Sequence, residues 1–144
     1  PIVKPWSKSA GTRASVPAMP ATTGITATAR SPATRATALF TADATYTEQP
    51  YQQAFAGSQG VREYWARVTA TQAAVEMQFG KPVTAGNLTA VEWWTTLTNG
   101  GVPITLAGCF MLRFDGSGKC SCLREYWHFA EGRQQPQPGW GKDA

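Results

Sequence analysis

The sequence predicts an α+β fold in which a helix covers one face of a curved antiparallel sheet. An apolar stripe at helical spacing predicts the helix over residues 58–72, and the stripe consists of Val61, Tyr64, Trp65 and Val68. From Ala74 onward, runs rich in β-branched and aromatic residues are separated by turn signals, which predicts strands. A length of 144 residues is typical of one domain, so helix and sheet are expected to share one core.

Two short elements are expected before this helix. Ser31-Pro32 offers an N-cap followed by a proline at the first helical position, which predicts a short helix in the segment up to Phe40. Residues 43–46 predict a short strand or turn. The sheet therefore begins, for the most part, after the main helix.

The strands after Ala74 predict a meander. In the first strand Val75, Met77 and Phe79 alternate with polar residues. Three long strands follow, and these are Leu88–Thr98, Val102–Phe114 and Lys119–Phe129. Asn99-Gly100 is a strong hairpin signal between the first two of them. Tight turns of this kind make the long strands antiparallel neighbours.

Turn lengths fix the register and hence the two faces of the sheet. A two-residue loop at Asn99-Gly100 pairs Trp93 with Leu106, and an even-length loop after Phe114 pairs Gly108 with Glu125. The inner face is then expected to hold Trp93, Thr95, Ile104, Leu106, Phe110, Leu112, Leu123, Glu125, Trp127 and Phe129. The outer face is expected to hold Glu92, Trp94, Cys109, Met111, Arg113, Cys122, Arg124, Tyr126 and His128.

Glu125 is the one carboxylate in the predicted inner wall. Burying an unpaired carboxylate costs several kcal/mol, so its pKa is expected to rise or its side chain to face a cavity. The alternative is a glutamate at the sheet rim that reaches water. Misfits of this kind are common at functional sites.

The outer face predicts a homodimer. Trp94, Met111 and Tyr126 supply much apolar area there, and His128 lies on the same face. A patch of this kind more often marks an interface than a free surface. We therefore expect a second copy to bury it.

The ends of the chain differ from the middle, so we predict a lead-in over residues 1–30, a domain over 31–131 and a frayed tail over 132–144. The net charge of +4 comes from the first forty residues, which carry five cations and no acid, whereas the rest carries eight cations and nine acids.

The lead-in has three interpretations: a loosely packed or disordered segment, a transit-like peptide, or coding DNA read out of frame. Since the domain itself is nearly neutral, we expect no nucleic-acid partner.

The cysteines predict thiols and not a disulfide framework. Cys109, Cys120 and Cys122 are odd in number, and the single histidine, His128, lacks a second one to complete a zinc set. We expect no metal, no cofactor and a reducing, cytoplasmic location. No apolar run approaches a membrane span, so no membrane partner is expected.

Five segments, taken in order, resemble one superfamily. They are the segment LFTADATYTEQP at residues 39–50, GVREYW at 60–65, VEW at 91–93, RFDGSGK at 113–119 and LREYW at 123–127. This order is similar to that of the nuclear transport factor 2-like superfamily, in the branch of SnoaL-like polyketide cyclases and limonene-epoxide-hydrolase-like proteins. The resemblance implies a cone, in which a strongly curved sheet wraps around helices and leaves a pocket between them.

The resemblance also implies a site. Tyr46 and Glu48 match the Tyr-x-Asn step of the epoxide-hydrolase-like members, with Glu in place of Asn, and Glu125 matches their last-strand carboxylate. Their Arg-x-Asp pair corresponds to Trp93 and Thr95, so the water-activating dyad is missing. The predicted pocket lining is Trp65, Trp93, Thr95, Leu106, Phe110, Leu123 and Trp127.

Two functions remain open. In the first, Glu125, Glu48 and Tyr46 form an acid/base group that cyclises, isomerises or hydrolyses a hydrophobic oxygenated molecule. In the second, the chain is a non-catalytic dimeric binding or accessory protein, and Glu48 is a structural residue that accepts backbone hydrogen bonds in its turn. The two carboxylates discriminate between these functions.

Overall fold

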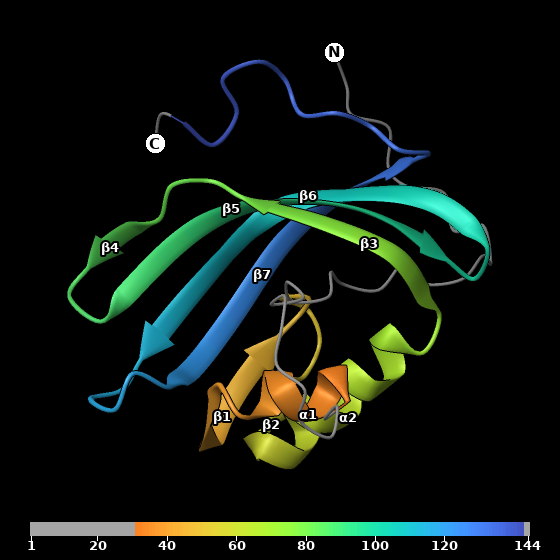
Figure 1. Cartoon of the computed structure of the whole chain (residues 1–144). Coiled ribbons are helices and arrows are strands. Elements are labelled where there is room, and N and C mark those ends of the chain that lie inside the picture. Colours follow the sequence, from red (N-terminus) through yellow and green to blue (C-terminus); the bar gives the residue numbers. More distant parts are fainter. Residues whose placement is uncertain (1–30, 143–144) are drawn as a thin grey trace, which may run out of the picture.

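The computed structural model describes residues 31–142, and it has a curved sheet packed over two helices (Figure 1). The elements in chain order are α1 Pro32–Thr37, β1 Phe40–Thr47, β2 Phe55–Ala56, α2 Gly57–Thr69, β3 Gln72–Phe79, β4 Val83–Ala85, β5 Leu88–Asn99, β6 Val102–Phe114 and β7 Cys120–Glu131. The α+β class with a curved sheet is thus confirmed. The predicted lead-in over residues 1–30 lies outside the described residues.

The sheet is mixed, with one parallel pair. Its strands follow the order β2-β1-β7-β6-β5-β3, and β4 pairs with β5. The meander of β5, β6 and β7 is antiparallel as predicted, whereas β1 pairs with β7 in parallel. The stretch expected as a short strand or turn over residues 43–46 is therefore part of an eight-residue strand. In Figure 1, β1, β2 and both helices lie on the concave side of the long strands.

Both predicted helices form, and local chemistry explains them. Ser31 caps α1, because its hydroxyl oxygen accepts a hydrogen bond from the backbone N–H of Thr34 at 3.3 Å, and Pro32 follows at the first turn. In α2 the predicted stripe is buried: Val61, Tyr64, Trp65 and Val68. This stripe covers the inner face of the sheet and makes most of the helix's contribution to the core.

The first hairpin turns one residue later than predicted. Its loop is Gly100-Gly101, both with positive φ (56° and 87°), and Asn99 pairs with Val102. A two-residue hairpin loop of this kind needs positive φ at both positions, and glycine adopts it without a steric penalty, so the Gly-Gly pair displaces Asn-Gly. The register shifts by two, which places Trp93 opposite Gly108 instead of Leu106.

The second long turn shifts its register by two as well. Glu125 lies opposite Phe110, and Gly108 lies opposite Trp127, instead of the predicted pairing of Gly108 with Glu125. The carboxylate of Asp115 accepts backbone hydrogen bonds from Ser117 and Lys119, which sets the loop, and an irregularity follows at Phe114. Since side chains alternate with a period of two, neither shift changes which residues face the core.

Gly108 marks a close approach of two strands. A Cβ atom built at this position would lie 2.8 Å from Cβ and 2.9 Å from Cα of Trp127, and still closer to the carbonyl oxygen of Tyr126. Trp93 and Trp127 flank this glycine on the neighbouring strands. A residue without a side chain is therefore required for β7 to pack so closely on β6 in this part of the sheet.

The chain after β7 was expected to fray, and the structure corrects this expectation. Residues 132–142, called here the C-terminal strap, run across the outer face of the sheet, away from the helices (Figure 1). Backbone and side-chain hydrogen bonds join the strap to β3, β5 and β6. Composition rich in proline and glutamine suggested a loose end, but the partners that bind it come from distant strands.

The longest described helix is α2, with 13 residues. Among residues 31–142, no helix is long and apolar enough to cross a membrane.

Candidate functional site

A buried carboxyl group lies at the centre of the candidate site. Glu125 is on β7 and its side chain points to the inner face, as the sequence predicted, with 1% of its surface exposed. This excludes the alternative of a glutamate at the rim that reaches water. Full burial of a carboxyl group has a free-energy cost that hydrogen bonds must offset.

Two tyrosines from other elements surround this carboxyl group. The Tyr64 hydroxyl, from α2, donates a hydrogen bond to Oε1 of Glu125 at 3.2 Å. Tyr46, from β1, packs its ring against that of Tyr64 with centroids 4.5 Å apart. The fold thus joins two strands and one helix that are distant in the sequence at one polar cluster. We call it the Tyr-Glu cluster, and its members are Tyr46, Tyr64 and Glu125.

The surroundings of the cluster favour neutral groups. Burial raises the pKa of Glu125 well above its ordinary value, and the charge of Glu48 raises it further, although the nearby hydroxyl groups of Tyr46 and Tyr64 oppose the shift. Burial likewise raises the pKa of Tyr46 and of Tyr64. The cluster therefore retains its protons to higher pH than the same groups would in water.

Glu48 acts on this cluster through its charge. It directly follows β1, is half-buried, and is one residue beyond the β1–β7 pair of Thr47 with Arg124. Its charge raises the pKa of all three cluster members. The two carboxyl groups that the sequence singled out thus interact electrostatically.

The predicted lining residues belong to the same core as Tyr46 and Tyr64. Six of them are buried, with exposed fractions of 8% or less: Trp65, Trp93, Thr95, Leu106, Phe110 and Leu123. Trp127 is half-buried and packs against the same core. The rings of Trp93 and Phe110 are in contact, with centroids 5.3 Å apart.

Several buried polar atoms of this inner region make no hydrogen bond within the described part of the chain. They are Tyr46 Oη, Trp65 Nε1, Trp93 Nε1, Thr95 Oγ1 and Glu125 Oε2. Native proteins leave few buried polar atoms unpaired, because each such atom costs about 1–3 kcal/mol. Their concentration on one side of the sheet makes this region the strongest candidate for chemistry or ligand binding.

A surface groove lies at a different place. It has a volume of about 420 Å³ and is formed by α2 and the end of α1, with the lining Thr37, Ser58, Gln59, Arg62, Glu63 and Ala66. None of the residues predicted to line the pocket contributes to it. The pocket expected between sheet and helices stays a prediction.

The outer face is partly covered by the chain itself. Trp94 donates its indole N–H to the carbonyl oxygen of Gln134 at 3.1 Å and packs against Trp140, so the strap covers part of the predicted dimer patch. Tyr126 is 48% exposed, Met111 is half-buried and His128 is exposed. The homodimer through this face stays a prediction.

The three cysteines are free thiols, of which Cys120 is buried. Burial raises the pKa of Cys120 to about 11, so this thiol stays protonated at neutral pH. Within residues 31–142, no three histidine, cysteine or acidic side chains are grouped so that they could hold a metal ion.

Comparison with known proteins agrees with this architecture. The model of the family described as SnoaL-like domain matches residues 22–122. The chain belongs to this family. The match covers β1, which carries Tyr46, and α2, which carries Tyr64, whereas Glu125 lies three residues beyond it.

Several solved structures align with the chain at low sequence identity. SalBIII, an epoxide hydrolase/cyclase-like enzyme in pyran ring formation in polyether salinomycin, aligns with a TM-score of 0.59 at 21% identity, over 67% of this chain and 78% of its own. A hypothetical protein with a ketosteroid isomerase-like fold from Catenulispora acidiphila, in complex with trimethylamine, has a TM-score of 0.56 at 23% identity, over 62% and 70%.

An epoxide hydrolase of LEH-like type from M. tuberculosis also aligns, with a TM-score of 0.56 at 16% identity, over 67% of this chain and 70% of its own. At such identities the alignments show a shared fold. No curated protein matches the chain.

Tyr64 is the member of the cluster that sequence reasoning placed only in the core. As part of the apolar stripe of α2 it was expected to supply buried area. A buried tyrosine hydroxyl needs a polar partner, and Glu125 was the one carboxyl group predicted on the facing wall. The sequence therefore contained the information that could have paired Tyr64 with Glu125.

Proposed function

We propose that this SnoaL-like protein binds a hydrophobic, oxygenated small molecule and acts on it by acid/base catalysis at the Tyr-Glu cluster. The observation that carries the proposal is the burial of Glu125, whose Oε1 accepts from Tyr64 while Oε2 has no hydrogen-bond partner in the described chain. A buried, protonated carboxyl group with one oxygen directed to no protein partner is suited to donate a proton.

The two carboxyl groups divide the acid and base roles. Glu125 retains its proton because of burial and the nearby charge of Glu48, so it serves as the acid. Glu48 is half-buried and serves as the ionised base. In a ring closure, a substrate hydroxyl would lose its proton to Glu48 and form a C–O bond to an epoxide carbon. The bond between that carbon and the epoxide oxygen would break, and this oxygen would receive the proton of Glu125.

Tyr46 would orient the substrate oxygen. Its hydroxyl is fully buried and makes no hydrogen bond of good geometry, although it lies close enough to Glu125 to affect the pKa of that group. A neutral phenol can donate to a carbonyl or ether oxygen while it remains protonated. The aromatic wall of Trp65, Trp93 and Phe110 favours a substrate whose remaining surface is apolar.

A non-catalytic binding protein is the second candidate. It is favoured by Trp93 and Thr95, because the resemblance implies that they correspond to the water-activating Arg-x-Asp dyad of epoxide-hydrolase-like members. In this case the same inner region binds its ligand, and Glu125 contributes a hydrogen bond without transferring a proton.

Substitution of Glu125 by Gln tests the proposal. The amide fills the same volume and accepts the bond from Tyr64, but it carries no transferable acidic proton. Turnover is to be measured by mass spectrometry on a panel of epoxides and cyclisable ketones. We expect the substrates that the unmodified chain converts to lose at least about a hundredfold in rate, the effect of removing a general acid.

Glu131→Gln is the matched control, because Glu131 ends the same strand with an exposed side chain. It should leave turnover unchanged. If the Glu125→Gln variant turned over the same substrates as fast as the unmodified chain, the proposal of acid catalysis by Glu125 would be wrong. If the unmodified chain binds panel members without converting any of them, the binding protein is the better description.

A further inference from the structure

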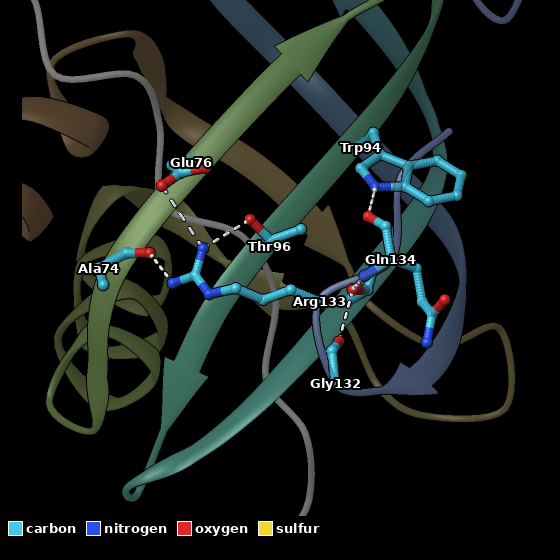
Figure 2. A network of polar contacts seen from close by, with 8 residues as sticks. Ala74, Glu76, Trp94, Thr96, Gly132, Arg133 and Gln134 are labelled. Carbon is cyan, nitrogen blue, oxygen red and sulfur yellow. Dashed lines mark hydrogen bonds and ion pairs between the residues drawn. The ribbon is translucent and has the colours of Figure 1, made fainter. Parts of the chain in front are cut away.

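The C-terminal strap is attached to the sheet by a polar network (Figure 2). The guanidinium of Arg133 donates to the carbonyl oxygen of Ala74 at 2.8 Å and to the hydroxyl of Thr96 at 3.0 Å. It also pairs with the carboxylate of Glu76 at 3.5 Å. One arginine thus joins the strap to both β3 and β5.

A second anchor lies on β6. The Thr105 hydroxyl donates to the carbonyl oxygen of Gly132 at 2.7 Å and accepts from the backbone N–H of Gln134 at 2.8 Å. Both anchors lie near the start of the strap, so they fix the direction in which it leaves β7.

Residues from both ends of the strap cover Trp94. The indole of Trp94 donates to Gln134, and its ring meets that of Trp140 edge-on with centroids 5.9 Å apart. The carbonyl oxygen of Gly141 then accepts from the backbone N–H of Lys81 at 2.9 Å. The strap therefore spans the outer face from β6 to the loop after β3.

The strap rests on this face and does not enter the core. None of its described residues is buried, and the Glu76 side chain that pairs with Arg133 is 78% exposed. Exposed ion pairs contribute little to stability, and segments with few buried contacts open at low free-energy cost. The strap is therefore attached at specific points and can be released without unfolding the sheet.

The surface beneath it continues into the exposed part of the outer face. Glu92, Cys109 and Tyr126 form the cross-strand row next to Trp94, and Met111 lies in the row after that. Three charged residues on the outer face of β5, β6 and β7 are exposed and form no ion pair within residues 31–142: Glu92, Arg113 and Arg124. A surface patch with charged groups of both signs can bind the same patch of a second copy across a two-fold axis, because the glutamate of each copy can then face an arginine of the other.

We propose that the C-terminal strap is an intrachain cap, and that its release allows a second copy of this chain to bind the outer face of β5, β6 and β7. The strap and the second copy compete for Trp94. The oligomeric state is then controlled by the few contacts of Arg133 and Trp140. This inference does not depend on the catalytic proposal, because the cap lies on the opposite face of the sheet.

The test uses the full chain with both contacts removed, as the double substitution Arg133→Ala and Trp140→Ala. Sedimentation equilibrium measures the dimerisation constant. We expect dimerisation at least about tenfold tighter than in the unmodified chain, since exposure of a tryptophan at an interface centre changes affinity by this order. A double substitution of two exposed strap residues, Gln135→Ala and Gln137→Ala, is the control and should leave the constant unchanged.

A third variant identifies the surface. Tyr126→Lys, added to the double variant, places a charge in the centre of the patch. The resulting triple variant should be monomeric. An unchanged dimerisation constant in the double variant would overturn the proposal, as would association that persists with Tyr126→Lys. If circular dichroism shows that the double variant is unfolded, the single substitution Arg133→Lys replaces it in the test. Lysine keeps the positive charge but lacks the forked guanidinium that donates two hydrogen bonds. An unchanged dimerisation constant in this single variant also overturns the proposal.

Discussion

Two neighbouring tryptophans on β5 illustrate the difference between the two faces of the sheet. Trp93 faces the helices, is fully buried, and its indole N–H has no hydrogen-bond partner in the described chain. Trp94 faces away from them, and its N–H donates to Gln134 of the strap. The same side chain is thus unsatisfied inside and satisfied outside.

The polar groups around each tryptophan follow the same division. On the outer face, Thr105 uses its hydroxyl twice, and Arg133 contacts three different residues. On the inner face, Glu125 uses one of its two oxygens, and Thr95 uses its hydroxyl for no hydrogen bond in the described chain. A satisfied network fixes structure, whereas an unsatisfied buried one is retained at a cost in stability, as expected at a functional site.

The largest predicted effect is a loss of stability of the whole sheet, which carries both faces. Gly108→Ala places a methyl group against the backbone of Tyr126 and Trp127, where no flexible side chain can give way. We expect a loss of about 4 kcal/mol or more in the free energy of unfolding, or failure to fold, measured by urea denaturation. Gly116→Ala is the control, since nothing lies within 4 Å of a Cβ there; its effect should stay within about 0.5 kcal/mol. Equal stability of the two variants would contradict the close approach of β6 and β7.

A smaller, pH-dependent effect isolates the inner face. The folded chain holds the Glu125 proton to higher pH than the unfolded chain, because burial raises the pKa in the folded state. The stability of the unmodified chain should therefore fall as pH rises from the ordinary glutamate pKa through the raised one. Glu125→Gln should remove this fall, so its stability relative to the unmodified chain increases as the pH rises above the ordinary glutamate pKa of about 4.3.

Thermal unfolding at a series of pH values measures this difference. Glu131→Gln, on the exposed end of the same strand, should show no such increase. A stability difference between the Glu125→Gln variant and the unmodified chain that does not change with pH would mean that Glu125 ionises normally in the fold.

The smallest predicted effect belongs to the outer face. Glu76→Gln removes the ion pair with Arg133 and leaves the hydrogen bonds of Arg133 to Ala74 and Thr96. We expect a loss of about 0–1 kcal/mol that disappears at about 1 M salt, since exposed charges are screened. Urea denaturation at low and high salt measures it. A loss above that range, insensitive to salt, would indicate a buried pair and weaken the contrast between the faces.

Sequence periodicity predicted the faces of the sheet but not its register. The inner position of Glu125 and the outer position of Trp94 followed from alternation, which two-residue shifts leave intact. The pairing of Trp93 with Gly108 did not follow, because it depends on which of two adjacent glycine-containing loops forms the turn. That choice is made by the positive φ of Gly100 and Gly101.

The candidate site was predicted in part. Glu125, Glu48 and Tyr46 were singled out together, and the structure shows that the charge of Glu48 affects the pKa of the other two. The hydrogen bond from Tyr64 joins residues 61 positions apart in the sequence and could not be deduced from local pattern. The same holds for the strap, whose composition indicated a loose end.

The sequence by itself determined the approximate positions of the helices, which strand residues alternate between faces, and which carboxyl group is buried, because these properties depend on spacing within one segment. Only the tertiary structure decided the partners: Tyr64 for Glu125, Arg133 for β3, and β1 in parallel beside β7. The physical reason is that such contacts are set by how distant segments pack around one core. Local propensity does not record that packing.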